Sequence, residues 1–182
     1  MSEPEGPVKG EGDTGGAPEA SEPGRTVSGA GDFDFLIGSW DVANRRLKLP
    51  LTGSDDWDEF PSTSECRGLF GGAANVDEFS IPARGFSGLT LRLFDPDREE
   101  WSLHWASSRD GRLQPPVTGR FEGGTGTFYS RETYNGADIT VRFIWSDITP
   151  RSARWEQAFS PDDGNTWETN WIMEFTRRES VV

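Results

Sequence analysis

Hydrophobic and polar residues begin to alternate at Trp40, and the alternation continues, broken by clusters of turn residues, almost to the end of the chain. Alternation with a period of two is typical of strands that have one buried and one exposed face. No helical period of comparable length occurs after residue 37. The pattern predicts ten strands: Trp40–Leu49, Trp57–Phe70, Ala74–Ile81, Phe86–Phe94, Glu100–Ala106, Val117–Phe121, Thr127–Tyr134, Ile139–Ile148, Ala153–Phe159 and Thr166–Phe175.

The connections between these strands predict an all-β, antiparallel protein. Most are short turns, such as Asn135-Gly136, which is the preferred sequence of a type I′ hairpin turn. The long connection Arg109–Pro116 is too rich in proline to continue a strand ladder. Ten strands joined in this way close most simply into an up-and-down barrel, since closure removes unpaired edges; a two-sheet sandwich is the alternative. A barrel of this size encloses more space than its side chains need, so we expect a ligand cavity.

The stretch Asp32–Asp41, DFDFLIGSWD, separates two parts of different composition. Its apolar residues, within Phe33–Ile37, predict a short helical plug at one barrel end, and Gly38-Ser39-Trp40 opens the first strand. Residues 1–31 are rich in Gly, Pro, Ser, Glu and Ala and contain no aromatic residue, so they bury too little apolar area to offset the entropy of ordering. We therefore expect a flexible acidic tail over residues 1–31 and a barrel domain over residues 32–182, with a lid over the pocket mouth as the alternative role of the tail.

Charge and composition exclude several classes of protein. The formal net charge of -13 argues against nucleic acid and anionic membrane surfaces as partners. One cysteine, Cys66, leaves no intrachain disulfide. The first residues lack the basic and apolar regions of a signal peptide, and no apolar run has membrane-spanning length. We expect a cytoplasmic protein without a nucleic-acid or membrane partner, and the oligomeric state, a dimer included, stays open.

Two features resemble a known family. Gly38-x-Trp40 at the start of the first strand resembles the opening motif of lipocalins and other calycins. In that family an arginine at the end of the last strand packs on the tryptophan, which implies a cation–π contact of Trp40 with Arg177 or Arg178. Over Phe33–Arg177 the chain resembles bacterial lipocalin-like proteins of unknown function, through the segments FDFLIGSWDV, EEWSLHWA, GRLQPP and RWEQAFSPDDGNTWETNWIMEFTR. The resemblance implies a ten-stranded barrel with a small-molecule cavity.

Neither a metal nor a cofactor is predicted. The nitrobindin branch of these barrels binds haem through a histidine near the C-terminus, whereas the single histidine here, His104, is in mid-chain. One histidine and one cysteine leave only carboxylates as metal ligands. No GxSxG motif supplies an activated serine either.

Side chains on the inner face of the strands are the candidates for ligand binding. If Trp40 points inward, Asn44 and Arg46 do too, unless Arg46 lies at the rim in solvent. In the last strand one face is predicted to carry Trp167, Thr169, Trp171, Met173 and Phe175. The candidate ligand-binding residues are Asn44, Arg46, Tyr129, Arg142, Trp155, Gln157, Thr169, Trp171 and Met173. Plain core packing is the alternative for the aromatic and apolar members of this set.

Two functions fit these residues. The first is a binding module that encloses a small, largely apolar or aromatic molecule. The second is a cofactor-free cyclase or isomerase of secondary metabolism, acting on a polyene- or polyketide-like chain that the cavity positions and one or two hydrogen bonds polarise. Arg46, His104 and Gln157 are the candidate catalytic donors, although His104 points outward if its neighbours Trp101 and Trp105 point inward. A third hypothesis, an interaction module without a ligand, predicts a barrel filled by its own side chains.

Overall fold

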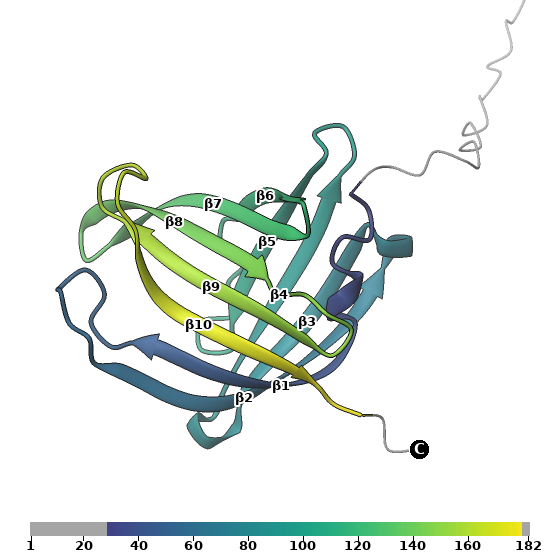
Figure 1. Ribbon diagram of the computed structural model, residues 1–182, viewed down its shortest axis with the longest axis horizontal. Helices are drawn as coiled ribbons and strands as arrows, with labels where there is room; N and C mark the ends of the chain where they lie inside the picture. Colours follow the sequence, from purple (N-terminus) through teal and green to yellow (C-terminus); the bar gives the residue numbers. More distant parts are fainter. Residues whose placement is uncertain (1–28, 180–182) are drawn as a thin grey trace, which may run out of the picture.

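The chain folds into a closed antiparallel barrel of ten strands, described by a computed structural model over residues 29–179 (Figure 1). The strands are β1 (Gly38–Leu47), β2 (Trp57–Leu69), β3 (Ala74–Ile81), β4 (Phe86–Asp95), β5 (Glu100–Ser107), β6 (Val117–Glu122), β7 (Thr125–Tyr134), β8 (Ala137–Ser146), β9 (Ser152–Ser160) and β10 (Glu168–Arg177). Each pairs with its neighbours in the chain, and β1 also pairs with β10. The ten predicted strands are confirmed with small shifts of their bounds, and closure excludes the sandwich.

Helical structure within the described residues amounts to three single 3-10 turns: η1 (Asp34–Leu36), η2 (Phe70–Gly72) and η3 (Pro82–Arg84). The predicted tail, residues 1–31, lies almost entirely outside residues 29–179, so its two proposed roles and the division of the chain at residue 31 stay predictions. Over the same described residues, no helix is long and apolar enough to cross a membrane.

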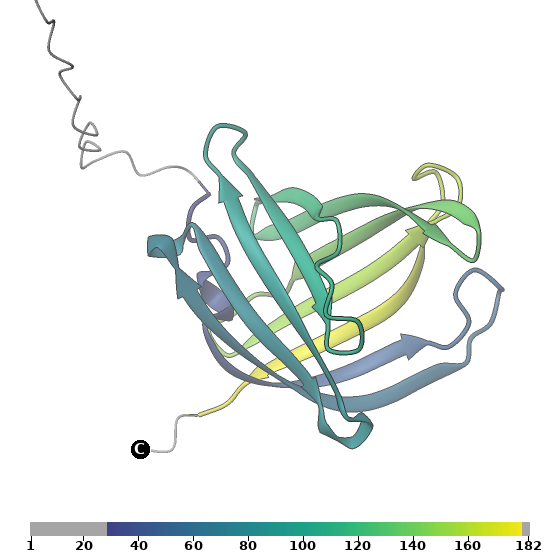
Figure 2. The ribbon, with the colours of Figure 1, turned by 180° about the vertical axis from the view of Figure 1, so that it is seen from behind.

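The barrel has two different ends because consecutive strands run in opposite directions. The loops after β1, β3, β5, β7 and β9 gather at one end, which we call the mouth (Figures 1 and 2). The loops after β2, β4, β6 and β8 gather at the other end, together with η1. Phe33, beside η1, is fully buried there, with its ring in edge contact with Trp101 at 5.0 Å and Phe121 at 4.9 Å. Leu36 is buried in the same aromatic cluster.

Trp40 is fully buried beneath η1 and is held from two sides. Its indole Nε1 donates a hydrogen bond to the carbonyl oxygen of Leu36 at 2.7 Å. The guanidinium carbon of Arg177 lies 4.1 Å from the centre of the Trp40 ring, so the predicted cation–π contact is confirmed for Arg177. Arg178 points to the other face of β10 and bonds Asp41.

The barrel wall is weakest between β5 and β6, which share three residue pairs, from Trp101↔Gly119 to Leu103↔Val117. Beyond them the predicted long connection crosses the gap, held by the hydrogen bond from the backbone N–H of Gln114 to the carbonyl of Trp105 at 2.7 Å. Residues 130–134 of β7, the half nearer the mouth, therefore pair with β8 but not with β6. This seam gives the barrel interior a route to the surface.

A β-bulge corrects the predicted phase of the last strand. The register of β10 against β9 shifts between Thr169, which faces Ala158, and Trp171, which faces Gln157. The extra residue at a bulge reverses the inside–outside alternation, so Asn170 is buried while Thr169 lies on the face opposite to Trp171. The prediction that one face carries every second residue from Trp167 to Phe175 therefore holds from Trp171 to Phe175 and is wrong for Trp167 and Thr169, which precede the bulge.

Candidate ligand cavity

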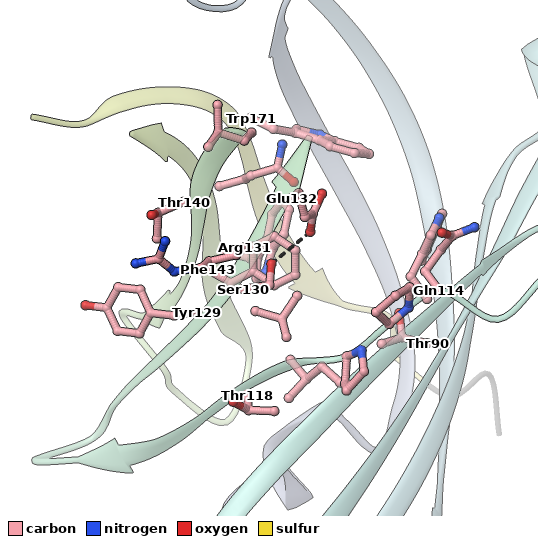
Figure 3. Close-up of a pocket in the computed structure, with 18 of the residues that line it drawn as sticks. Thr90, Gln114, Thr118, Tyr129, Ser130, Arg131, Glu132, Thr140, Phe143 and Trp171 are labelled. Carbon is pink, nitrogen blue, oxygen red and sulfur yellow. Dashed lines mark hydrogen bonds between the residues drawn. The ribbon is translucent and has the colours of Figure 1, made fainter. Parts of the chain in front are cut away.

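The barrel interior contains a cavity of about 1200 Å³ that side chains do not fill. That volume is somewhat above the range of roughly 300–1,000 Å³ typical of ligand pockets. In Figure 3, Phe143 and Ser130 lie on one side of this space and Thr90 and Gln114 on the other. The predicted cavity is therefore present, and it opens at the mouth and at the β5–β6 seam.

Aromatic rings make up much of the cavity wall. Trp155 contacts Trp171 edge to face at 5.6 Å and Phe143 at 4.8 Å between ring centres. On the opposite wall Phe79 lies 6.4 Å from Trp105 and 6.3 Å from Trp171. Rings in such contacts hold one another's orientation, so the wall offers flat apolar surfaces to a ligand.

Gly88 on β4 explains the position of Trp105. A Cβ atom at residue 88 would lie 1.8 Å from the indole of Trp105, so any side chain there would displace the ring. The absence of a side chain at Gly88 therefore lets the Trp105 indole approach the backbone of β4 closely. The expectation that Trp101 and Trp105 point inward and His104 outward is confirmed by the strand register, in which Trp105 pairs with Thr90 and His104 with Leu91.

Asn44 lies on the inner face but its polar atoms are already bonded. Its amide nitrogen donates to the Ser62 hydroxyl at 2.7 Å, and its carbonyl oxygen accepts the indole N–H of Trp171 at 3.1 Å. Arg46, two residues further along β1 and on the same face, stacks on the same Trp171 ring at 4.6 Å. The two residues thus fix Trp171, and Arg46 lies at the mouth with part of its side chain exposed.

Gln157 joins the main cavity to a second pocket of about 310 Å³ at the mouth. Its amide nitrogen donates to the carbonyl oxygen of Asn170 at 2.8 Å, a contact that exists because of the bulge. Trp155 and Met173 line the main cavity directly. The inner face of the barrel therefore brings together six of the predicted residues, namely Asn44, Arg46, Trp155, Gln157, Trp171 and Met173.

The remaining candidates lie on the outer face of the barrel. Tyr129 alternates with the buried Phe128, pairs with Arg142 and points away from the cavity (Figure 3). The Arg142 guanidinium stacks on Trp167 at 4.2 Å, and Thr169 is carried outward by the bulge. His104 also faces outward, where its Nε2 lies 3.3 Å from the Ser102 hydroxyl. The barrel wall separates Arg142, Thr169 and His104 from the cavity, whereas Tyr129 borders the space at the open edge of β7 although its ring points away from it.

A buried ion pair at the cavity floor was missed by sequence reasoning. Arg92 on β4 donates from one guanidinium nitrogen to Asp77 at 2.8 Å and to Asn75 at 2.9 Å, and Ser64 donates to the other oxygen of Asp77. Arg92 also stacks over Phe33 at 5.2 Å. The sequence did contain an indication that Arg92 is buried, because strict alternation in Phe86–Phe94 puts Arg92 on the same face as two phenylalanines.

The described residues of the floor do not form a metal site. Across residues 29–179, no group of three or more His, Cys, Asp or Glu side chains is placed to hold a metal ion. Cys66 is buried near the ion pair, and burial raises the pKa of its thiol to about 11, against the opposing effect of Arg92. A thiol with this pKa is a poor nucleophile and metal ligand at neutral pH.

Comparisons with known proteins identify the fold. No protein-family model matches the chain, and no curated protein matches its sequence. Among solved structures, the chain is similar to the S-type phycobiliprotein lyase CPES from Guillardia theta, with a TM-score of 0.51 and 12% sequence identity over 81% of this chain and 91% of that chain. At this identity the similarity establishes the closed antiparallel barrel, and the function must be argued from the cavity.

Proposed function

We propose that this protein binds a small, largely apolar or aromatic molecule inside its barrel. The observation that carries the proposal is the cavity of about 1200 Å³ lined by aromatic rings. An interaction module would fill the space, because a protein core normally packs to the density of an organic crystal. The structural match to a phycobiliprotein lyase covers most of both chains. This similarity is consistent with a barrel that binds a small molecule.

The two ends of the barrel suit this role. Phe33 and Leu36 lie within the aromatic cluster at the end opposite the mouth, and we infer that they serve as the plug that closes it. Gly38-x-Trp40 with its stacked Arg177 supports membership of the lipocalin-like group. A ligand then enters through the mouth or the β5–β6 seam and reaches a blind floor.

Binding is favoured over cyclase or isomerase activity by the positions of the three candidate donors. His104 faces away from the cavity, and the amide nitrogen of Gln157 is bonded to Asn170. Arg46 is free to polarise a substrate carbonyl, and Gln157 keeps one amide N–H beyond its bond to Asn170. Both donors lie where the cavity meets the open mouth, which is a weak basis for catalysis because electrostatic stabilisation depends on donors held in a site that excludes water.

The test is a titration of the full chain with N-phenylnaphthylamine, a neutral aromatic dye whose fluorescence rises in apolar surroundings. Thr90→Phe places a ring in the cavity, and Thr176→Phe makes the same change on the exposed outer face of β10. We expect the first variant to weaken dye binding by about tenfold or more, ~1.4 kcal/mol, and the second to leave it unchanged. Equal affinity in both variants, with unaltered melting temperatures, would place the dye outside the barrel and contradict the proposal.

A further inference from the structure

The second pocket, at the mouth, has an unbalanced set of charges. It is lined by three cationic side chains, Arg46, Lys48 and Arg84, and by one carboxylate, Asp58. Arg84 bonds Asp58 through both guanidinium nitrogens, at 2.8 and 3.0 Å. Lys48 pairs with Asp56 at 2.9 Å, outside the pocket. Two of the three cations are therefore neutralised, and Arg46 makes no ion pair within residues 29–179.

Arg46 is held in position without an ion pair among the described residues, because the carboxylate opposite it on β2, Asp58, is bonded to Arg84. Its guanidinium stacks on Trp171 at 4.6 Å, and Trp171 is itself fixed by Asn44. Burial of the guanidinium against the pocket wall lowers its pKa, while Tyr134 and Asp58 act in the opposite direction. An arginine keeps its charge at neutral pH even so. The pocket thus carries one positive charge that is partly removed from water and fixed in orientation.

Asn170 provides a second, independent feature of the pocket. It is 1% exposed, and its amide nitrogen has no hydrogen-bond partner among the described residues. Its carbonyl oxygen accepts the bond from Gln157, so the free N–H group is left beside the pocket that Asn170 lines. A buried donor without an acceptor costs about 1–3 kcal/mol, which an acceptor supplied by a ligand would recover.

We infer that the mouth pocket binds the acidic group of an amphipathic ligand with a single negative charge, whose apolar or aromatic part occupies the main cavity. The inference rests on the proposed function and adds the class of the ligand. Gln157 lines both spaces and Arg46 stacks on Trp171 of the cavity wall, so the two spaces adjoin and a ligand that extends past Gln157 reaches Arg46. An acid at the other end of the cavity would meet Arg92, which Asp77 already neutralises.

The experiment uses two dyes that differ by one acidic group. Anilinonaphthalene sulfonate is N-phenylnaphthylamine with a sulfonate, so comparing them isolates the charge. Arg46→Met removes the cation from the mouth pocket. Arg45→Met is the matched control, because Arg45 is the next residue, also stacks on a tryptophan, Trp57 at 5.1 Å, and points outward to Glu59. Full-length protein is titrated with each dye, and the melting temperature of each variant is measured.

We expect Arg46→Met to weaken sulfonate binding by about tenfold or more, ~1.4 kcal/mol, and to change binding of the neutral dye by less than about twofold. Arg45→Met should change neither, and Arg46→Lys should retain most of the sulfonate affinity. Sulfonate binding to the unmodified protein should weaken with added NaCl, while binding of the neutral dye should not, which tests the charge even if Arg46→Met fails to fold.

Three results would overturn the inference. Unchanged sulfonate affinity in Arg46→Met would show that the anion does not contact this side chain. Equal losses in Arg45→Met and Arg46→Met would point to the overall charge of the protein, and equal losses for both dyes in Arg46→Met would point to packing. In each of these cases the neutral dye still reports on the cavity. Failure of the neutral dye to bind the unmodified protein would instead overturn the proposed function, and this inference with it.

Discussion

Replacing Trp40 with alanine should be among the most destabilising single changes in the barrel. Trp40 has no exposed surface, lies edge to face with Phe175 at 6.0 Å and is covered by the Arg177 guanidinium at 4.1 Å. Arg177 also donates to the backbone carbonyls of Ile37 at 2.6 Å and Pro150 at 2.7 Å. The tryptophan therefore supports Arg177, whose side chain ties the segment before the first strand to the β8–β9 loop.

The expected loss follows from these contacts. Removing a fully buried tryptophan side chain costs about 3–5 kcal/mol, through lost transfer energy and the cavity left behind. The carbonyl of Leu36 also loses its donor. We expect a loss of about 4 kcal/mol, which for a domain of this size lowers the melting temperature by roughly 8–16 °C. Trp40→Phe keeps a ring under Arg177 but removes the N–H donor, so it should cost about 1–2 kcal/mol.

Urea denaturation followed by circular dichroism measures these losses without depending on tryptophan fluorescence. The matched control is Trp57→Ala, which removes another tryptophan stacked by an arginine, but one that is partly exposed on the outer face. It should cost about 1 kcal/mol. Equal losses in the two alanine variants, or a loss below about 1 kcal/mol for Trp40→Ala, would refute the reasoning that this tryptophan anchors the closed end.

Two further predictions concern the buried polar groups of the floor. Because its thiol pKa is about 11, Cys66 should be about one part in a thousand thiolate at about pH 8 and should react with a disulfide reagent far more slowly in the folded protein than in urea; equal rates would contradict its burial. Arg92→Met should cost about 3–5 kcal/mol because it leaves Asp77 as a buried charge without its cation, and Arg92→Met/Asp77→Leu should recover most of this loss. Equal unfolding free energies for the single and double variants would show that the unpaired charge is not the cause.

The strands and the closed barrel could be predicted from the sequence because both follow from local patterns. Alternation marks a half-buried strand, and short turns such as Asn135-Gly136 leave antiparallel pairing as the simple arrangement. The contact of Trp40 with Arg177 was predictable from the family resemblance. Closure itself was an inference from strand number, and the pairing of β1 with β10 confirms it.

The candidate site was predicted only in part. One cause of the wrong side-chain orientations is a feature that the alternation of residues cannot reveal. A bulge inserts one residue without changing the composition of a strand, so the phase extrapolated backwards along β10 failed at Asn170. Tyr129 and Arg142 were placed without a nearby residue of known orientation, and they lie outside. Arg92 was overlooked because a charged residue suggests a surface position, although its buried partner Asp77 is contributed by the adjacent strand β3.

The difference between the two ends of the cavity sets the orientation of an acidic ligand. At the floor an added anion would lie close to both Arg92 and Asp77, so attraction and repulsion nearly cancel and the cost of removing the anion from water remains. At the mouth the neighbouring carboxylate of Asp58 is neutralised by Arg84, so Arg46 keeps a net attraction for the anion, and a contact at about 4 Å is worth up to about 4 kcal/mol at the effective dielectric of a protein surface. The acid therefore stays at the mouth, where water can still reach it, and the aromatic floor receives the apolar end.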